Sequence, residues 1–144
     1  MDTVKDDYQK PVQEVYESLP TETKEWVDKQ VVKVWVYFGV WCIFLLTASV
    51  VLGCFILSEI VDDPIEKRIQ RSGSIIPFVV VLGEALFIGK INKLASVIHP
   101  AQLTCEIYMQ RRFKILVNGS LILTFIIMAV GSILSGYGDL LFRL

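Results

Sequence analysis

Two long stretches of this sequence contain no charged residue. Residues 34–58 form the first, which is 25 residues long, and residues 115–138 form the second, which is 24 residues long. Because a helix rises about 1.5 Å per residue, each stretch reaches roughly 36 Å and exceeds the ~30 Å hydrocarbon layer of a bilayer. Soluble domains distribute apolar residues periodically instead of in unbroken runs of this length. The two stretches therefore predict an integral membrane protein.

A third, weaker candidate span lies between them. Residues 72–89 are eighteen residues long and contain one acid, Glu84. The sequence thus predicts an all-α membrane protein with about three transmembrane helices, at residues 34–58, 72–89 and 115–138. If the middle segment is re-entrant instead of spanning, the two termini lie on the same side of the membrane.

The charged residues gather in the segments between and before these spans. In residues 1–33 an apolar stripe runs from Val12 to Leu19, and Pro20 ends it, which predicts a short amphipathic helix followed by a second helix continuous with the first span. Residues 90–114 show helical spacing on both sides of a break at His99 and Pro100. The predicted organisation is an amphipathic region at 1–33 and a membrane domain at 34–144, with a polar helical loop at 90–114.

Lysine and arginine are distributed unevenly between the predicted water-facing segments. If all three segments span, one side carries ten of them: Lys5, Lys10, Lys24, Lys29, Lys33, Lys90, Lys93, Arg111, Arg112 and Lys114. The other side carries four: Lys67, Arg68, Arg71 and Arg143. Because basic residues near membrane ends are retained in the cytoplasm, the asymmetry predicts a cytoplasmic N-terminus.

A basic cluster and an acidic region, both outside the spans, suggest which partners these segments contact. Arg111, Arg112 and Lys114 lie at the start of the third span, where basic side chains contact phosphate headgroups or a partner. The N-terminal helices carry many acids, which a helix lying on anionic lipid avoids. These acids are Glu14, Glu17, Glu22, Glu25 and Asp28. They favour a partner protein or self-association, and a merely solvated surface is the alternative.

Glu84 is the one acid inside a predicted span, and a charge at the bilayer centre costs on the order of 3 kcal/mol. It is predicted to face protein or water, either as a proton or ion relay or gate, or as a group solvated near the end of its helix. Small residues four apart occur at Ser49 and Gly53, at Gly131 and Ser135, and at Ser132 and Gly136. Such pairs let helices approach closely, within one bundle or in a homodimer.

The sequence shows no arrangement typical of an enzyme. It contains no acid and base pair, no nucleophile beside a histidine, no glycine-rich phosphate loop and no metal-ligand spacing, so no catalytic residue, cofactor or metal is predicted. The net charge of −1 gives no reason to expect binding to nucleic acid. The expected partners are the lipid bilayer and another protein.

Two motifs resemble segments of small bacterial inner-membrane proteins carried by mobile elements. Residues 71–74 (RSGS) open the apolar segment that contains Glu84, and residues 131–141 read GSILSGYGDLL. With its length, acidic N-terminal region and few spans, the chain is similar to the entry-exclusion proteins of conjugative plasmids and integrative conjugative elements. The resemblance implies a bacterial inner-membrane protein that blocks redundant transfer by contacting a protein of the transfer apparatus.

Other functions fit the same plan. A phage superinfection exclusion protein has a similar layout. Glu84 and the small-residue faces are also compatible with a holin-like oligomeric pore. The absence of catalytic groups is compatible with a small accessory subunit of a larger membrane complex.

Overall fold

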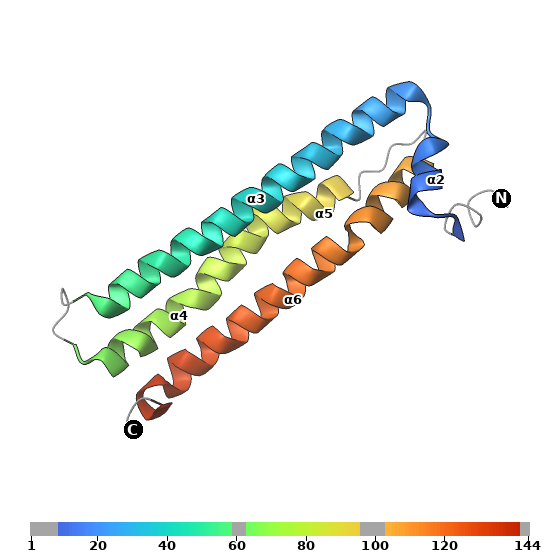
Figure 1. Ribbon diagram of the computed structural model, residues 1–144. Helices are drawn as coiled ribbons and strands as arrows, with labels where there is room; N and C mark the ends of the chain where they lie inside the picture. The colour runs from blue at the N-terminus through green and yellow to red at the C-terminus, as the bar shows by residue number, and fades with distance from the viewer. Residues whose placement is uncertain (1–8, 59–62, 96–102, 142–144) are drawn as a thin grey trace.

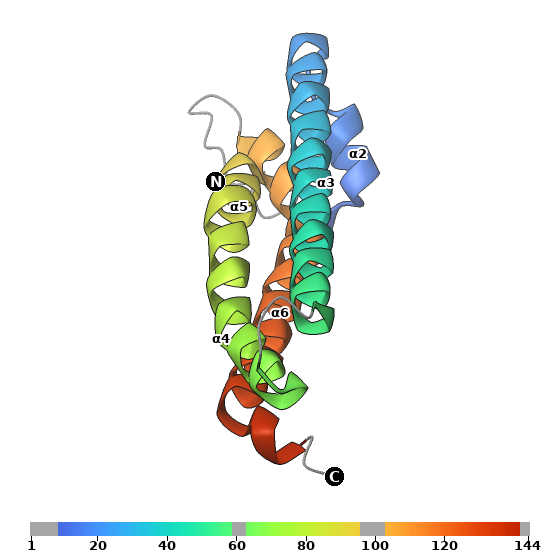
Figure 2. The same cartoon turned by 90° about the vertical axis from the view of Figure 1, so that its left-hand side faces the viewer.

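In the computed structural model the described residues are 9–58, 63–95 and 103–141, and every element in these ranges is a helix. The elements are α2 (Val12–Glu17), α3 (Thr21–Leu57), α4 (Ile65–Gly83), a π-helical turn η1 (Glu84–Ile88), α5 (Gly89–Ala95) and α6 (Leu103–Leu141). Figure 1 shows that α4, η1 and α5 form one continuous rod, which runs antiparallel to α3 and α6. The view turned by 90° shows the same three rods along one axis (Figure 2).

Among the described residues, three helices are long and apolar enough to cross a membrane: Thr21–Leu57, Ile65–Lys93 and Thr104–Gly138. The predicted all-α membrane fold with three spanning helices is therefore confirmed. The middle helix does not turn back on itself, which is the geometry of a full crossing and not of a re-entrant segment (Figure 1). It also begins at Ile65, directly after Pro64, and so is longer than the segment 72–89 recognised by its composition.

Helices α3 and α6 both begin well before their charge-free stretches. Helix α3 has 37 residues, and it runs without a break from the polar residues after Pro20 into the first span, as predicted. Helix α6 has 39 residues and likewise begins among polar residues. The polar loop predicted at 90–114 is therefore built largely from the ends of membrane helices, and its residues 96–102 lie outside the described ranges.

Helices α4 and α6 approach each other most closely, because small residues face one another between them. A methyl group added at Gly73 would lie 2.5 Å from the backbone nitrogen of Ser135. One added at Gly131 would lie 2.8 Å from Cβ of Ile76. Ser72 is buried beside Gly73, and its hydroxyl donates a hydrogen bond to the carbonyl of Arg68, 2.9 Å away. Close backbone contact is how membrane helices associate when burial of apolar surface gives little drive.

A second packed region lies where α2, the start of α3, α5 and the start of α6 meet. Its buried side chains form one cluster with those of the adjoining part of the three long helices. The cluster contains Val15, Leu19, Val27, Val34, Trp41, Ile88, Ile91, Cys105, Tyr108, Met109, Phe113 and Val117. The chain folds back at Pro20, so Val15 of the short helix α2 and Leu19, just after that helix, are buried against the long helices.

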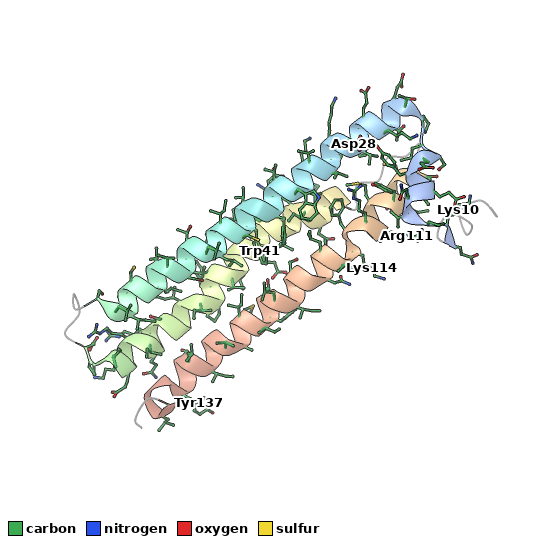
Figure 3. The ribbon with its side chains drawn as sticks, in the orientation of Figure 1. Lys10, Asp28, Trp41, Arg111, Lys114 and Tyr137 are labelled. Atoms are coloured by element: carbon green, nitrogen blue, oxygen red, sulfur yellow. The ribbon has the colours of Figure 1, made fainter. Side chains whose placement is uncertain are left out.

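Large apolar side chains cover the outside of the bundle. Ile43, Leu46, Phe78 and Phe125 are each between 64% and 69% exposed. Apolar surface of this extent is unfavourable in water and is the surface that lipid chains cover. Trp35 and Tyr137 are both exposed and lie toward opposite ends of the apolar surface, where aromatic side chains favour the membrane interface; Tyr137 is labelled in Figure 3.

Candidate functional site

The polar end of the bundle forms a compact unit, which we call the head: residues 12–33 of α2 and α3 together with residues 103–114 of α6. Within it, Tyr16 holds α2 against α3, because its hydroxyl donates to both carboxylate oxygens of Asp28, at 2.9 and 3.0 Å. The hydrogen bond to this carboxylate raises the pKa of Tyr16. Lys24 adds a second link by donating to the carbonyl of Glu17, at 2.9 Å.

The head also joins segments that are distant in the sequence. The Tyr16 and Tyr108 rings pack with their centroids 5.2 Å apart. The Arg111 guanidinium donates to the carbonyl of Lys10 across 2.6 Å. Figure 3 shows Lys10, Asp28 and Arg111 gathered at this end of the molecule. The short helix α2 is therefore fixed both to the helix that follows it and to α6.

The three basic residues predicted to contact headgroups have different surroundings. Arg111 is half-buried and links α6 to α2. Arg112 lies over the rings of Tyr108 and Phe113, with its guanidinium carbon 5.6 and 5.9 Å from their centroids, and donates to the Tyr108 hydroxyl. Lys114 is exposed at the start of the third span. Arg112 and Lys114 are therefore the members of this group with side chains at the surface.

The surface of α2 and of the first turns of α3 carries more acids than bases. Four carboxylates of α2 and the first turns of α3 are exposed: Glu14, Glu17, Glu22 and Glu25. They belong to the part of the molecule that precedes the apolar surface of α3, whereas Arg112 and Lys114 adjoin that apolar surface. The head thus presents negative charge away from the membrane and positive charge at its boundary.

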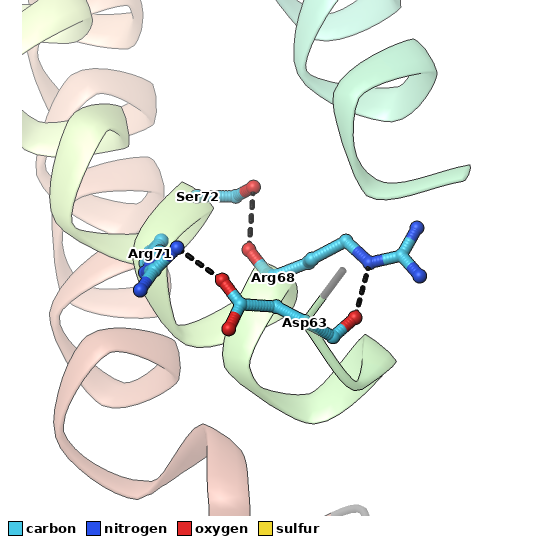
Figure 4. Close-up of polar contacts among 4 residues, drawn as sticks. All are labelled: Asp63, Arg68, Arg71 and Ser72. Carbon is cyan, nitrogen blue, oxygen red and sulfur yellow. Dashed lines mark hydrogen bonds and ion pairs between the residues drawn. The ribbon is translucent and has the colours of Figure 1, made fainter. Parts of the chain in front are cut away.

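A polar cluster closes the opposite end of the bundle. Arg68 of α4 donates to the carbonyl of Asp63, at 2.8 Å, and to the carbonyls of Ile56 and Ser58, at the end of α3 and directly after it. Arg71 pairs with the Asp63 carboxylate. Figure 4 shows both arginines around Asp63. Because the last carbonyls of a helix have no partner within it, Arg68 supplies donors that the end of α3 requires.

The small residues singled out in the sequence divide into two groups. Gly131 and Ser135 lie in the close contact between α4 and α6. Ser49 and Gly136 are exposed, and an added methyl group at Gly53 or Gly136 would meet no atom within 4 Å. The hydroxyl of Ser49 donates to the carbonyl of Leu45 in its own helix. Only the first group contributes to packing inside the bundle.

Glu84 is half-buried and is the first residue of the π-helical turn η1. Such turns are rare and occur often at functional sites. The neighbouring Gly83 faces the Phe44 ring of α3, which an added methyl group would approach to 3.1 Å. Glu84 therefore lies beside a tight contact between the middle rod and α3, and it stays a candidate intramembrane polar site.

Sequence reasoning missed two structural determinants, Gly73 and Arg68. Gly73 has no sequence signal as a packing residue, because its small partner Ser135 lies on another helix. In the sequence, Arg68 contributes only one positive charge to its segment. A second small residue four positions from Gly73 would be the sequence signal of a packing face there. The hydrogen bonds of Arg68 have no sequence signal, since their acceptors include backbone carbonyls of another helix.

Within residues 9–58, 63–95 and 103–141, no group of histidine, cysteine, aspartate and glutamate side chains is placed to hold a metal ion. No protein-family model, curated protein or solved structure matches the chain.

Proposed function

We propose that this chain is a non-enzymatic exclusion protein of a bacterial inner membrane, which blocks redundant transfer of a conjugative element by contacting a protein of the transfer apparatus. In this proposal the three long helices are the anchor, and the head is the contact surface on the cytoplasmic side. The proposal combines the resemblance of residues 71–74 and 131–141 to entry-exclusion proteins with the structure of the head.

The observation that carries the proposal is the exposed acidic surface of the head. Its carboxylates stand on helices that are fixed in place, because α2 is bound to α3 through Tyr16 and Asp28 and to α6 through Arg111. A preformed charged surface loses little conformational entropy on binding. Anionic headgroups repel it, so its complement is a basic protein surface.

The proposal is tested by expressing the chain in recipient cells and measuring incoming conjugation of related and unrelated elements, with phage infection measured in parallel. We expect fewer transconjugants for a related element than in recipients with an empty vector. Unchanged frequencies for every element would contradict the assignment. A fall in phage infection alone would replace it by superinfection exclusion.

Reversing charge on the head is expected to abolish this protection. Glu22→Lys combined with Glu25→Lys changes two exposed carboxylates without touching the contacts that fix α2, and like charges facing a basic partner cost several kcal/mol. Glu66→Lys, at the opposite end of the bundle, is the matched control and should leave protection intact. Membrane levels of each variant are compared by immunoblot. Full protection by the double variant would exclude the acidic surface as the contact.

A further inference from the structure

A groove runs between α3 and α6 at the boundary between the head and the membrane-spanning part. These two parallel helices make few direct contacts with each other, because the rod of α4, η1 and α5 packs against both. The groove has a volume of about 560 Å³, within the range of about 300–1,000 Å³ that is usual for small-ligand sites. Its lining residues are Trp35, Phe38, Trp41, Arg112, Phe113, Ile115, Leu116, Gly119, Ser120 and Leu123.

The groove is open toward the apolar surface of the bundle. Gly119 leaves part of it empty, since an added methyl group there would meet no atom within 4 Å. Ile115, at its edge, is 85% exposed. Trp35, Phe38 and Trp41 form the opposite wall from α3. A flexible hydrocarbon chain fits such a surface, and in a bilayer it is available from the adjoining lipid.

The lining of this groove holds one charged side chain, and its other members are apolar apart from Ser120. Arg112 lies at the end nearest the head, and the rings of Tyr108 and Phe113 hold its guanidinium in place. Arginine binds phosphate through two parallel N–H groups. Its position three residues before the charge-free stretch 115–138 places it at headgroup depth. The groove therefore combines one anion-binding group with an apolar channel that leads from it into the membrane.

We propose that this groove binds one anionic phospholipid, with its phosphate on Arg112 and one acyl chain lying past Gly119 toward Leu123. Positive charge beside an apolar channel complements an anionic headgroup with its chain, and basic pockets between membrane helices recognise such lipids. The site is separate from the acidic surface of the head, so it stands independently of the proposed partner.

Tryptophan fluorescence tests the proposal directly, because Trp35 and Trp41 line the groove. The full chain is reconstituted in phosphatidylcholine vesicles, and brominated phosphatidylglycerol or brominated phosphatidylcholine is added at equal mole fractions. We expect the anionic lipid to reach half-maximal quenching at a mole fraction about fivefold lower. Trp26 lies in the head, outside the groove lining, and contributes a constant background.

Two variants and two controls separate this site from general surface attraction. Arg112→Gln should abolish the fivefold preference. Gly119→Leu should reduce quenching by the anionic lipid, because the larger side chain fills the groove and its Cβ meets no other atom. Gly53 also has open space around it but lies outside the groove, so Gly53→Leu should behave as the wild type. Lys114→Gln removes an exposed charge of the same sign outside the lining and should retain the preference.

Equal quenching by the two lipids in the wild type would overturn the proposal. So would an equal loss of preference in Lys114→Gln and Arg112→Gln, since attraction would then be general. Wild-type quenching in Gly119→Leu would exclude the acyl chain from the groove. Circular dichroism of each variant confirms that the helices are retained.

Discussion

Replacing Gly73 with alanine is expected to lower the free energy of unfolding by about 1–3 kcal/mol, the usual cost of overpacking a tight contact. The added methyl group would lie 2.5 Å from the backbone nitrogen and 2.8 Å from the backbone carbonyl carbon of the facing residues Ser135 and Leu134. Backbone atoms cannot rotate away as a side chain does, so α4 and α6 must separate. Gly131→Ala is expected to act in the same direction, against Ile76 and Pro77.

Alanine in place of glycine also favours a helix by about 1 kcal/mol, which opposes this loss. Gly53→Ala and Gly136→Ala isolate that term, since neither added methyl group meets an atom within 4 Å. The measurement is reversible unfolding in mixed micelles followed by circular dichroism. We expect the controls to be neutral or stabilised. A Gly73→Ala protein as stable as these controls would contradict the close contact between α4 and α6.

Replacing Arg68 with alanine is expected to cost about 1.5–3 kcal/mol, the usual value for hydrogen bonds that involve a charged group. Its guanidinium donates to the carbonyls of Ile56, Ser58 and Asp63, so the change leaves acceptors at the end of α3 without their donor. Arg68→Lys should recover little of the loss. A lysine ammonium is a compact charge and does not reproduce the planar set of donors that reaches several carbonyls.

Arg71→Ala is the matched control, because Arg71 lies three residues further along the same helix and carries the same charge. Its side chain is 58% exposed and pairs with Asp63, and exposed ion pairs contribute only about 0–1 kcal/mol. Unfolding in micelles, as above, compares the two variants. Equal losses for Arg68→Ala and Arg71→Ala would show that charge alone matters at this end, contrary to the hydrogen bonds in Figure 4.

The order of the helices along the chain and their approximate positions could be predicted from the sequence, because both depend on local properties. An absence of charge over 24 or 25 residues determines which segments enter a membrane. Pro20 ends one helix and starts the next, because it lacks an N–H and restricts its own backbone angle. The same rules underestimate the length of the middle helix, because its first turns contain charged residues and so resemble a loop in composition.

The geometry of the candidate site could not be predicted in the same way. Tyr16 contacts Tyr108, and Arg111 contacts the carbonyl of Lys10, across long separations in the sequence. No periodicity encodes such pairs, since each depends on how two helices are rotated about their axes. For the same reason Gly53 and Gly131 look alike in the sequence, where each belongs to a pair of small residues four apart. In the structure their surroundings differ.

We propose a topology in which the three long helices cross the membrane and leave the head in the cytoplasm. Its most direct test is labelling of single cysteines with a membrane-impermeant maleimide, in a chain whose Cys42, Cys54 and Cys105 are replaced by alanine. The labelled positions are Gln13 in the head and Lys67 at the opposite end, both exposed. We predict that Lys67→Cys is labelled in spheroplasts and that Gln13→Cys is labelled only after permeabilisation. Equal labelling of the two positions in spheroplasts, or labelling of Gln13→Cys alone, would contradict the account.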